Sequence, residues 1–220
     1  MATITEKLDL NILGAGGFAS EVCWAALNDK YSQYDVKGFF SDIPADQGRL
    51  LCGRQVGGPV EPSNTAIRQA HIICGVGSPQ LKHKFVTKLG SGYKYGNVIH
   101  RAVEMWRERV QIGVGTVICA GSVLTVDVTI GNHVNINLNC TVGHDTRIGD
   151  FSNLSPGVHV SGRVKIEEGV DIGSGVCINP GVTLGCWSII GAGAVVTKDV
   201  PPNSLAVGVP AVIKSIVKRV

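Results

Sequence analysis

An adjacent histidine and aspartate, His144 and Asp145, are the residues of this chain best suited to acid–base chemistry, and they stand in the segment NCTVGHDTRIGDF. Histidine has an unperturbed pKa of about 6.5, so it is the natural base near neutral pH. A carboxylate that orients an imidazole raises its basicity and stabilises the imidazolium that forms. Because adjacent residues of a strand point to opposite faces, Asp145 can reach His144 only at a corner of the chain, which Gly143 permits. We therefore expect a general base at a turn.

A six-residue repeat supplies the elements that must position this pair. Fifteen consecutive positions at a spacing of six residues, from Ile112 to Val196, are Ile, Leu or Val. The fifth position of the hexads is small or valine, as at Val158, Val164, Val170, Val176 and Val182. One large and one small inward side chain per six residues are typical of a parallel β-helix, whereas a β-sandwich would need period-two strands. Three hexads per triangular coil would give five coils, about 24 Å tall at a strand spacing of roughly 4.8 Å. The register points Val142 and Ile148 inward and His144 outward.

The first hundred residues follow a different pattern, in which strands alternate with helices. Short apolar runs predict strands over residues 8–13, 35–40 and 71–77, and helical spacing follows in residues 18–30 and 78–90. Alternation of this kind indicates βαβ units and a parallel sheet. We expect three regions: a βαβ domain over 1–98, a β-helix over 99–205 and a C-terminal tail over 206–220.

The composition argues against a nucleic-acid or membrane partner. The 220-residue chain has a net charge of only +3, and its Lys and Arg residues form no block that could track a phosphate backbone. No apolar run reaches the length of a membrane span, and the N-terminus lacks the basic-then-apolar layout of a signal peptide. Seven cysteines without a C-x-x-C spacing indicate a reduced compartment and no zinc site. We therefore expect a cytoplasmic protein with no bound metal.

The hexads resemble those of the hexapeptide-repeat acyltransferases, and residues 189–214, IIGAGAVVTKDVPPNSLAVGVPAVIK, resemble that family's last coil and exit loop. GAGG in a βαβ domain before the β-helix, NVIH at residues 97–100, and CTVGHD followed by IGDF are together similar to a narrower group. That group is the sugar N- and O-acetyltransferases of the sialic-acid O-acetyltransferase and bacillosamine-pathway type. The resemblance implies an α/β N-terminal half-Rossmann βαβ domain followed by an all-β left-handed parallel β-helix. It also implies a homotrimer with active sites between subunits, in which His144 and Asp145 are the catalytic residues.

The resemblance further implies that acetyl-CoA is the acetyl donor and lies along the β-helix. The matching positions of this chain are Asn153, Gly162, Ser174 and Ala192. Gly191 is expected to let the ligand approach the backbone closely. Many family members carry histidine where Asn153 stands, and the asparagine can still donate a hydrogen bond to the thioester or the pantetheine. Lys198 is expected to contact the phosphates, and the alternative is a lysine that is simply solvated.

The segment GAGGFA, Gly14 to Ala19, satisfies the G-x-G-x-x-G/A pattern of a dinucleotide fold. The domain of about 95 residues is closer to one mononucleotide half, and a glycine turn at a helix N-terminus binds one phosphate-bearing group. The resemblance implies that a UDP- or dTDP-linked sugar binds here, near Gly16, Gly17, Phe18, Asp42, Gly77 and Lys82. Many relatives carry histidine where Phe18 stands. The alternative is that the glycines serve only a tight turn.

The remaining histidines and Cys140 have weaker functional interpretations. His133 and His159 lie on the coils without a following acid and are expected to be surface or inter-subunit polar residues. His100 lies at the junction of the two halves, where it lines the sugar pocket or packs. His83 is expected to be solvated on its helix. Cys140 could carry an acyl group in a ping-pong mechanism, but its small inward hexad position favours core packing.

The residues and the resemblance together predict an acetyl-CoA-dependent N-acetyltransferase acting on a nucleotide-linked amino sugar, a 4-amino-4,6-dideoxy sugar used in glycan synthesis. His144 would take the proton from the amine as the amine attacks the thioester directly. Two alternatives remain. An O-acetyltransferase acting on sialic acid or a related sugar would need the same base. A non-catalytic nucleotide-sugar or NAD sensor would use the β-helix as a trimeric scaffold, and the intact His–Asp pair argues against it.

Overall fold

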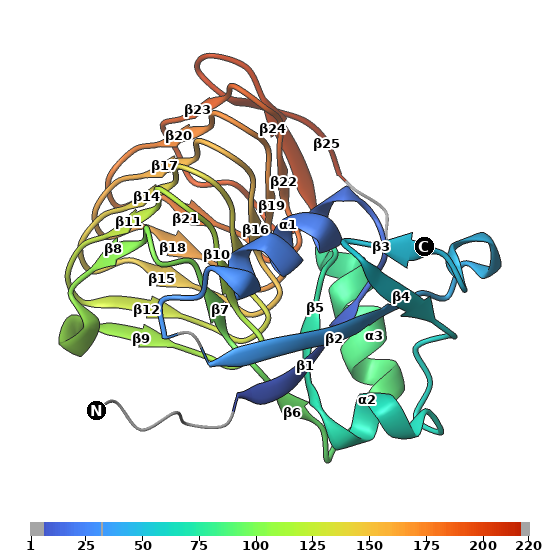
Figure 1. Cartoon of the computed structure of the whole chain (residues 1–220). Coiled ribbons are helices and arrows are strands. Elements are labelled where there is room, and N and C mark those ends of the chain that lie inside the picture. Colours follow the sequence, from blue (N-terminus) through green and yellow to red (C-terminus); the bar gives the residue numbers. More distant parts are fainter. Residues whose placement is uncertain (1–6, 32, 217–220) are drawn as a thin grey trace.

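The chain changes architecture where alternating strands and helices give way to short strands alone (Figure 1). The structure is a computed structural model and describes residues 7–31 and 33–216. The N-terminal part is a twisted sheet with helices, and the remainder is a three-sided prism of stacked coils that lies beside it. None of the helices in the described residues has the length and apolar character that a membrane crossing requires.

The N-terminal sheet has six strands in the order β3-β4-β2-β1-β5-β6, and β1 pairs in parallel with β2 and β5. Its elements are β1 Leu8–Leu13, α1 Gly17–Leu27, β2 Tyr34–Phe40, η1 Pro44–Asp46, β3 Leu50–Leu51, β4 Arg54–Gly57, α2 Thr65–Gln69, β5 His71–Cys74, α3 Pro79–Leu89 and β6 Lys94–Tyr95. The three predicted strands and two predicted helices are confirmed. The third strand ends at Cys74 instead of Gly77, and Gly75, the next residue, packs closely against Ile12 and Ala19.

The prism has three flat faces, each a parallel ladder of very short strands. Face 1 contains β7 Val98–Ile99, β10 Val117–Ile118, β13 Asn135–Ile136, β16 Asn153–Leu154, β19 Asp171–Ile172, β22 Ile189–Ile190, β24 Ser204–Val207 and the antiparallel β25 Val212–Ile216. Face 2 contains β8 Glu104–Met105, β11 Val123–Leu124, β14 Thr141–Val142, β17 His159–Val160, β20 Cys177–Ile178 and β23 Val195–Val196. Face 3 contains β9 Val110–Ile112, β12 Val128–Ile130, β15 Arg147–Ile148, β18 Lys165–Ile166 and β21 Thr183–Leu184, with η2 Arg107–Arg109 before it.

The predicted hexad register is confirmed by burial. Of the fifteen inward positions, fourteen are buried, and Ile112 in the first coil is half-buried against the same core. The valines at the fifth hexad positions belong to this core as well. Each coil advances three hexads, so residues eighteen apart stack, as His159 pairs with Cys177. We name the corners of the prism by the faces they join: the 1–2 edge, the 2–3 edge and the 3–1 edge.

The N-terminal domain covers face 1 and the 3–1 edge of the prism. Its main core cluster includes Val98 and Val117 of face 1 together with residues of α1 such as Val22. On the 3–1 edge, the ring of His83 from α3 packs edge-on against Phe151 and Trp187, at centroid distances of 5.0 and 5.5 Å. This packing places the end of β1 next to the β-helix.

The last described residues, in the region expected to be a C-terminal tail, form strands. Strand β24 continues face 1 beside β22, and β25, over Val212–Ile216, pairs back antiparallel with β24. Residues 217–220 lie outside the described part of the chain.

Candidate active site

The His144–Asp145 pair lies on the 2–3 edge, at the turn between β14 and β15. His144 Nδ1 and Asp145 Oδ2 are 2.7 Å apart, and both side chains are about half exposed. If Nδ1–H donates to the carboxylate, the lone pair is on Nε2, which is the arrangement that a general base needs. The expectation that the pair sits at a corner is confirmed, since Asp145 adopts a left-handed backbone conformation with a φ of 59°.

Backbone hydrogen bonds on both sides hold this corner in place. Asp145 N donates to Val126 O at 3.1 Å on one neighbouring coil, and Arg163 N donates to His144 O at 2.7 Å on the other. A hollow of about 440 Å³ borders Asp145 and is lined in part by Arg109, which pairs with Asp127, and by Arg147. The main chain of the pair is therefore held in place beside open space.

The residues expected to bind acetyl-CoA lie on two different edges of the prism. Gly162 stacks directly on His144 at the 2–3 edge, and Lys198 is exposed in the loop after β23 on the same side. Ser174 and Ala192 are exposed corner residues of the 1–2 edge, where Gly193 N donates to Ser174 O at 2.8 Å. Gly191 precedes that corner. One subunit does not bring the two edges together.

Asn153, which the resemblance places at the acetyl-CoA site, has its side-chain amide bonded within this subunit. It lies on face 1 and is 7% exposed, and its Nδ2 donates to Asp171 Oδ1 at 2.9 Å. Burial raises the pKa of Asp171, and the hydrogen bond from Asn153 opposes that rise. The Asn153 amide is engaged within a polar ladder that continues to Asn135, whose Nδ2 donates to Val76 O at 2.9 Å.

The glycine loop follows β1 and opens onto the N-terminus of α1. Gly16 and Gly17 are exposed, and the N-cap residue Gly16 has no side chain that could accept a hydrogen bond from the first N–H groups of the helix. Gly14, with a φ of 116°, passes so close to the exit of β5 that an added Cβ would lie 2.7 Å from Val76 Cγ1. The carboxyl ends of β1, β2 and β5 meet here, which is where open α/β sheets bind their ligands.

The other residues predicted near this loop have distinct surroundings. Phe18 is half-buried against the domain core, and Gly77 is half-exposed on the exit loop of β5. Asp42 follows β2, accepts a hydrogen bond from Val60 N at 2.8 Å and pairs with Lys88 at 3.3 Å. Its carboxylate therefore supports the local loop structure.

Arg49 is a residue near the glycine loop that the sequence analysis did not identify. Its guanidinium donates to the carbonyl of Ala15 within that loop and pairs with Asp46 at 3.0 Å. Asp46 is held in turn by Ser41 at the end of β2. An arginine separated by 34 residues from the loop carries no sequence signal of this contact, because only the fold brings the two segments together.

The histidines outside the His144–Asp145 pair differ in burial, because the N-terminal domain packs over some of them. The prediction for His133 is wrong: it is 5% exposed and its ring stacks on Phe151 at 5.2 Å, because the N-terminal domain covers the 3–1 edge. Burial, with the charge of Lys82, lowers the pKa of His133 to about 4. His100 is buried and packs against Trp24 at 4.5 Å. His159 is exposed, as expected.

Cys140 is fully buried in the core of the prism, which confirms the packing interpretation over a nucleophilic one. Burial raises the pKa of its thiol, so the reactive thiolate is disfavoured. Among the described residues, no group of three or more His, Cys, Asp or Glu side chains is arranged to hold a metal ion.

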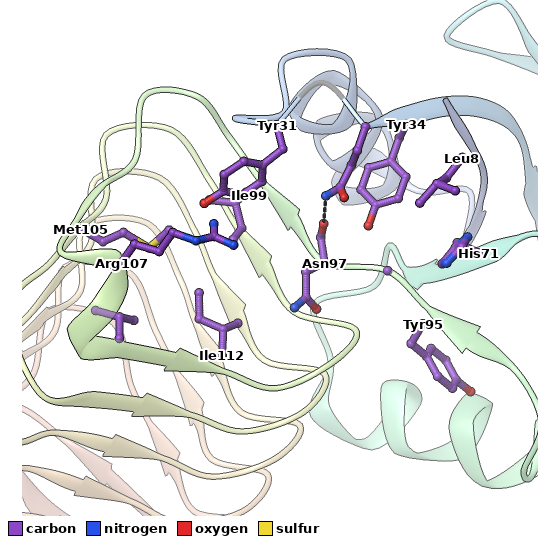
Figure 2. Close-up of a pocket in the computed structure, with 13 residues that line it drawn as sticks. Leu8, Tyr31, Tyr34, His71, Tyr95, Asn97, Ile99, Met105, Arg107 and Ile112 are labelled. Carbon is purple, nitrogen blue, oxygen red and sulfur yellow. Dashed lines mark hydrogen bonds between the residues drawn. The ribbon is translucent and has the colours of Figure 1, made fainter. Parts of the chain in front are cut away.

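A second cavity, of about 510 Å³, lies between the N-terminal sheet and the first coil (Figure 2). Tyr34 and His71 line one side, and Arg107 lies under the ring of Tyr31 on the other, with Asn97 between them. This cavity adjoins the starting ends of β1, β2 and β5, opposite the glycine loop. It contains none of the predicted site residues.

Comparison with known proteins relates this arrangement to a family. Residues 9–89 match the PglD N-terminal domain family. A mutant of perosamine N-acetyltransferase from Caulobacter crescentus, solved with CoA and GDP-perosamine, has a TM-score of 0.85 and 31% identity, covering 94% of this chain and 97% of that one. The acetyltransferase domain of PglB from Neisseria gonorrhoeae has a TM-score of 0.84 and 28% identity, covering 94% of this chain and 100% of that one. The chain belongs to the hexapeptide-repeat sugar acetyltransferases.

Family membership confirms the expected fold class, an α/β domain followed by a left-handed parallel β-helix. The galactoside O-acetyltransferase of Lactococcus lactis is 40% identical over 104 residues, which are 46% of this chain and 50% of that protein. The chain spans 41% of one of its curated relatives, a putative acetyltransferase of Schizosaccharomyces pombe, and 50% of the Lactococcus protein. The PglB domain has also been solved with acetyl coenzyme A.

The resemblance implies that Lys82 lies near the nucleotide sugar, but the structure buries Lys82. Its side chain is fully buried, and Nζ donates to His133 O at 2.8 Å and to Ser152 O at 3.0 Å. Burial lowers the pKa of Lys82 to about 7, although Cys74 and Asp171 act in the opposite direction. Lys82 therefore joins α3 to the 3–1 edge and does not face an acceptor.

Lys82→Met should remove a pH dependence of stability between about pH 7 and pH 10. In this window the unfolded chain keeps a proton that the folded protein has released, so the stability of the wild type rises with pH, by up to about 1.4 kcal/mol per unit. Denaturant unfolding at several pH values should show the free-energy difference between wild type and variant growing with pH. Lys84→Met, an exposed lysine on the same helix, is the control and should run parallel to the wild type. If the unfolding free energy of Lys82→Met changed with pH in parallel with that of the wild type, the pH dependence could not be assigned to Lys82.

Proposed function

We propose that this protein is an acetyl-CoA-dependent N-acetyltransferase that acts on a nucleotide-linked amino sugar, a 4-amino-4,6-dideoxy sugar. The observation that carries the proposal is the 2.7 Å contact between His144 Nδ1 and Asp145 Oδ2 at an exposed edge of the β-helix. The relatives named above supply the chemical context, since one was solved with CoA and GDP-perosamine and another with acetyl coenzyme A.

His144 acts as the general base in this proposal, with Asp145 holding its ring. Nε2 accepts the proton of the amine as the amine nitrogen forms a bond to the acetyl carbonyl carbon. The carbon–sulfur bond of the thioester then breaks, and the proton on Nε2 leaves with the thiolate as free thiol. Asp145 stabilises the imidazolium between the two transfers through the contact at Nδ1. No acyl-enzyme forms, which agrees with the burial of Cys140.

The acceptor's nucleotide binds at the glycine loop. The uncapped N-terminus of α1 at Gly16 and Gly17 offers N–H groups and a positive dipole end to a phosphate. Phe18, Gly77 and Arg49 border the same opening, and Asp42 shapes it from the end of β2. The family resemblance implies UDP or dTDP as the nucleotide, and the GDP-linked acceptor of the Caulobacter relative adds GDP to the set to be tested.

The donor lies between subunits of a homotrimer. His144, Gly162 and Lys198 are on the 2–3 edge, whereas Ser174, Gly191 and Ala192 are at the 1–2 edge. A neighbouring subunit can bring its own 1–2 edge to the 2–3 edge of this one, which a single prism cannot do. Heterologous contacts of this kind close into a ring of three.

O-acetylation is the second candidate, favoured by the match to galactoside O-acetyltransferase. A hydroxyl also loses a proton to a positioned imidazole, so His144 would have the same role. N-acetylation and O-acetylation are therefore distinguished by whether the acceptor that turns over carries an amine or a hydroxyl group.

Acetyl transfer should be measured as thiol release from acetyl-CoA with GDP-, UDP- and dTDP-linked amino sugars, their hydroxyl counterparts and sialic acid. We expect turnover with a nucleotide-linked amino sugar. His144→Asn should lower kcat at least about a hundredfold, because a positioned base contributes roughly that much. His159→Asn, an exposed histidine on the next coil, is the control and should retain activity. Turnover with hydroxyl acceptors alone would favour the second candidate, and no turnover with any acceptor would refute both.

Mixing two inactive variants should restore activity if the site lies between subunits. His144→Asn disables the 2–3 edge, and Ala192→Trp blocks the 1–2 edge with a large side chain at an exposed corner. In randomly mixed trimers about a quarter of the interfaces combine two intact edges, so about a quarter of the wild-type activity should return. The measurement is kcat after co-refolding in equal amounts. No recovery, with mixed trimers shown by mass spectrometry, would place the site within one subunit.

A further inference from the structure

Gly162 lies directly beneath the imidazole of His144. A Cβ added at Gly162 would lie 2.5 Å from Nε2, 2.7 Å from Cε1 and 2.9 Å from Cδ2 of that ring. These three ring atoms are also the three atoms nearest to such a Cβ. The ring of His144, the proposed base, is therefore the group nearest to the space that a side chain at position 162 would fill.

Rings also lie over Gly115 and Gly169, but those two glycines have a left-handed φ, and the contact at Gly162 differs in another way from that at Gly149. A Cβ at Gly149 would meet backbone atoms, Glu167 C at 2.6 Å and Glu168 N at 2.7 Å. Backbone atoms in a hydrogen-bonded ladder cannot yield, whereas a half-exposed histidine ring can rotate away. Gly162 also does not have a left-handed φ, so alanine suits its backbone.

We propose that Gly162 is a positioning residue for His144, a function that rests on the proposed acetyltransferase activity. The missing side chain lets the imidazole lie flat against the coil, with Nδ1 at 2.7 Å from Asp145 Oδ2. The main chain at His144 cannot adjust to a larger residue, because Arg163 N holds its carbonyl at 2.7 Å. A methyl group at position 162 must therefore displace the ring itself, which separates Nδ1 from the carboxylate and moves Nε2 from the reacting proton.

Gly162→Ala should lower kcat by roughly a hundredfold, the size of effect that a misplacement of about 1 Å can cause. Its unfolding temperature should stay close to that of the wild type, because the only displaced group is a partly exposed ring. The control Gly149→Ala should do the opposite, losing thermal stability but keeping kcat per folded molecule. In a protein that already carries His144→Asn, adding Gly162→Ala should lower kcat little further, because there is no imidazole ring left to displace.

Two further readouts separate positioning from a direct contact with the donor. Isothermal titration with CoA should give a Kd for Gly162→Ala that rises far less than kcat falls, because the main chain at position 162 still borders the donor. A crystal structure of the variant should show the Nδ1–Asp145 contact broken. If the His144 ring has not moved in the crystal structure of Gly162→Ala, the proposal is wrong. This holds if kcat is unchanged, and it also holds if kcat and the affinity for CoA fall together. If the wild type acetylates no acceptor, the proposed function fails, and the ring position in the Gly162→Ala crystal structure still decides the role of Gly162.

Discussion

The backbone hydrogen bonds between stacked coils are the interaction on which the rest of this structure depends. Each coil repeats after eighteen residues, so the position of one residue fixes its neighbours above and below. Gly143 N bonds to Val160 O at 2.8 Å and Arg163 N to His144 O at 2.7 Å, and these bonds place His144 over Gly162. The core valines and isoleucines keep this ladder in register, because a shift by one residue would turn them outward. The chemistry of the site is thus a consequence of coil geometry.

The second constraint is the attachment of the N-terminal domain to the prism. Apolar packing against face 1 and the aromatic contacts of His83 along the 3–1 edge set the direction of the glycine loop. Lys82 adds two hydrogen bonds to buried carbonyls there, at the expense of a desolvated amine. A buried lysine with only carbonyl partners is weak evidence for a gain in stability. It does specify how α3 packs against the coils, because in any other arrangement the two buried carbonyls would lose their hydrogen bonds at a cost in free energy.

Local patterns in the sequence predict the parts of this molecule that depend on local contacts. The hexad period correctly identified the inward residues, the outward His144 and the corner that joins it to Asp145. The same period could not distinguish a solvent-facing edge from one covered by another domain. His133 and Asn153 therefore face outward from their coils, as the period predicts, and are nevertheless buried. Lys82 and Arg49 depend on contacts across 34 to 70 residues of sequence, which no periodicity encodes.

The central claim is that the coil geometry holds His144 with Nδ1 protonated toward Asp145 and the lone pair on Nε2. The most direct test is the ¹⁵N NMR spectrum of the two ring nitrogens, assigned by their absence in His144→Asn and recorded where the ring is neutral. The account predicts a protonated Nδ1 and an unprotonated Nε2, with that preference lost in Asp145→Asn. A proton on Nε2 in the wild type would contradict it.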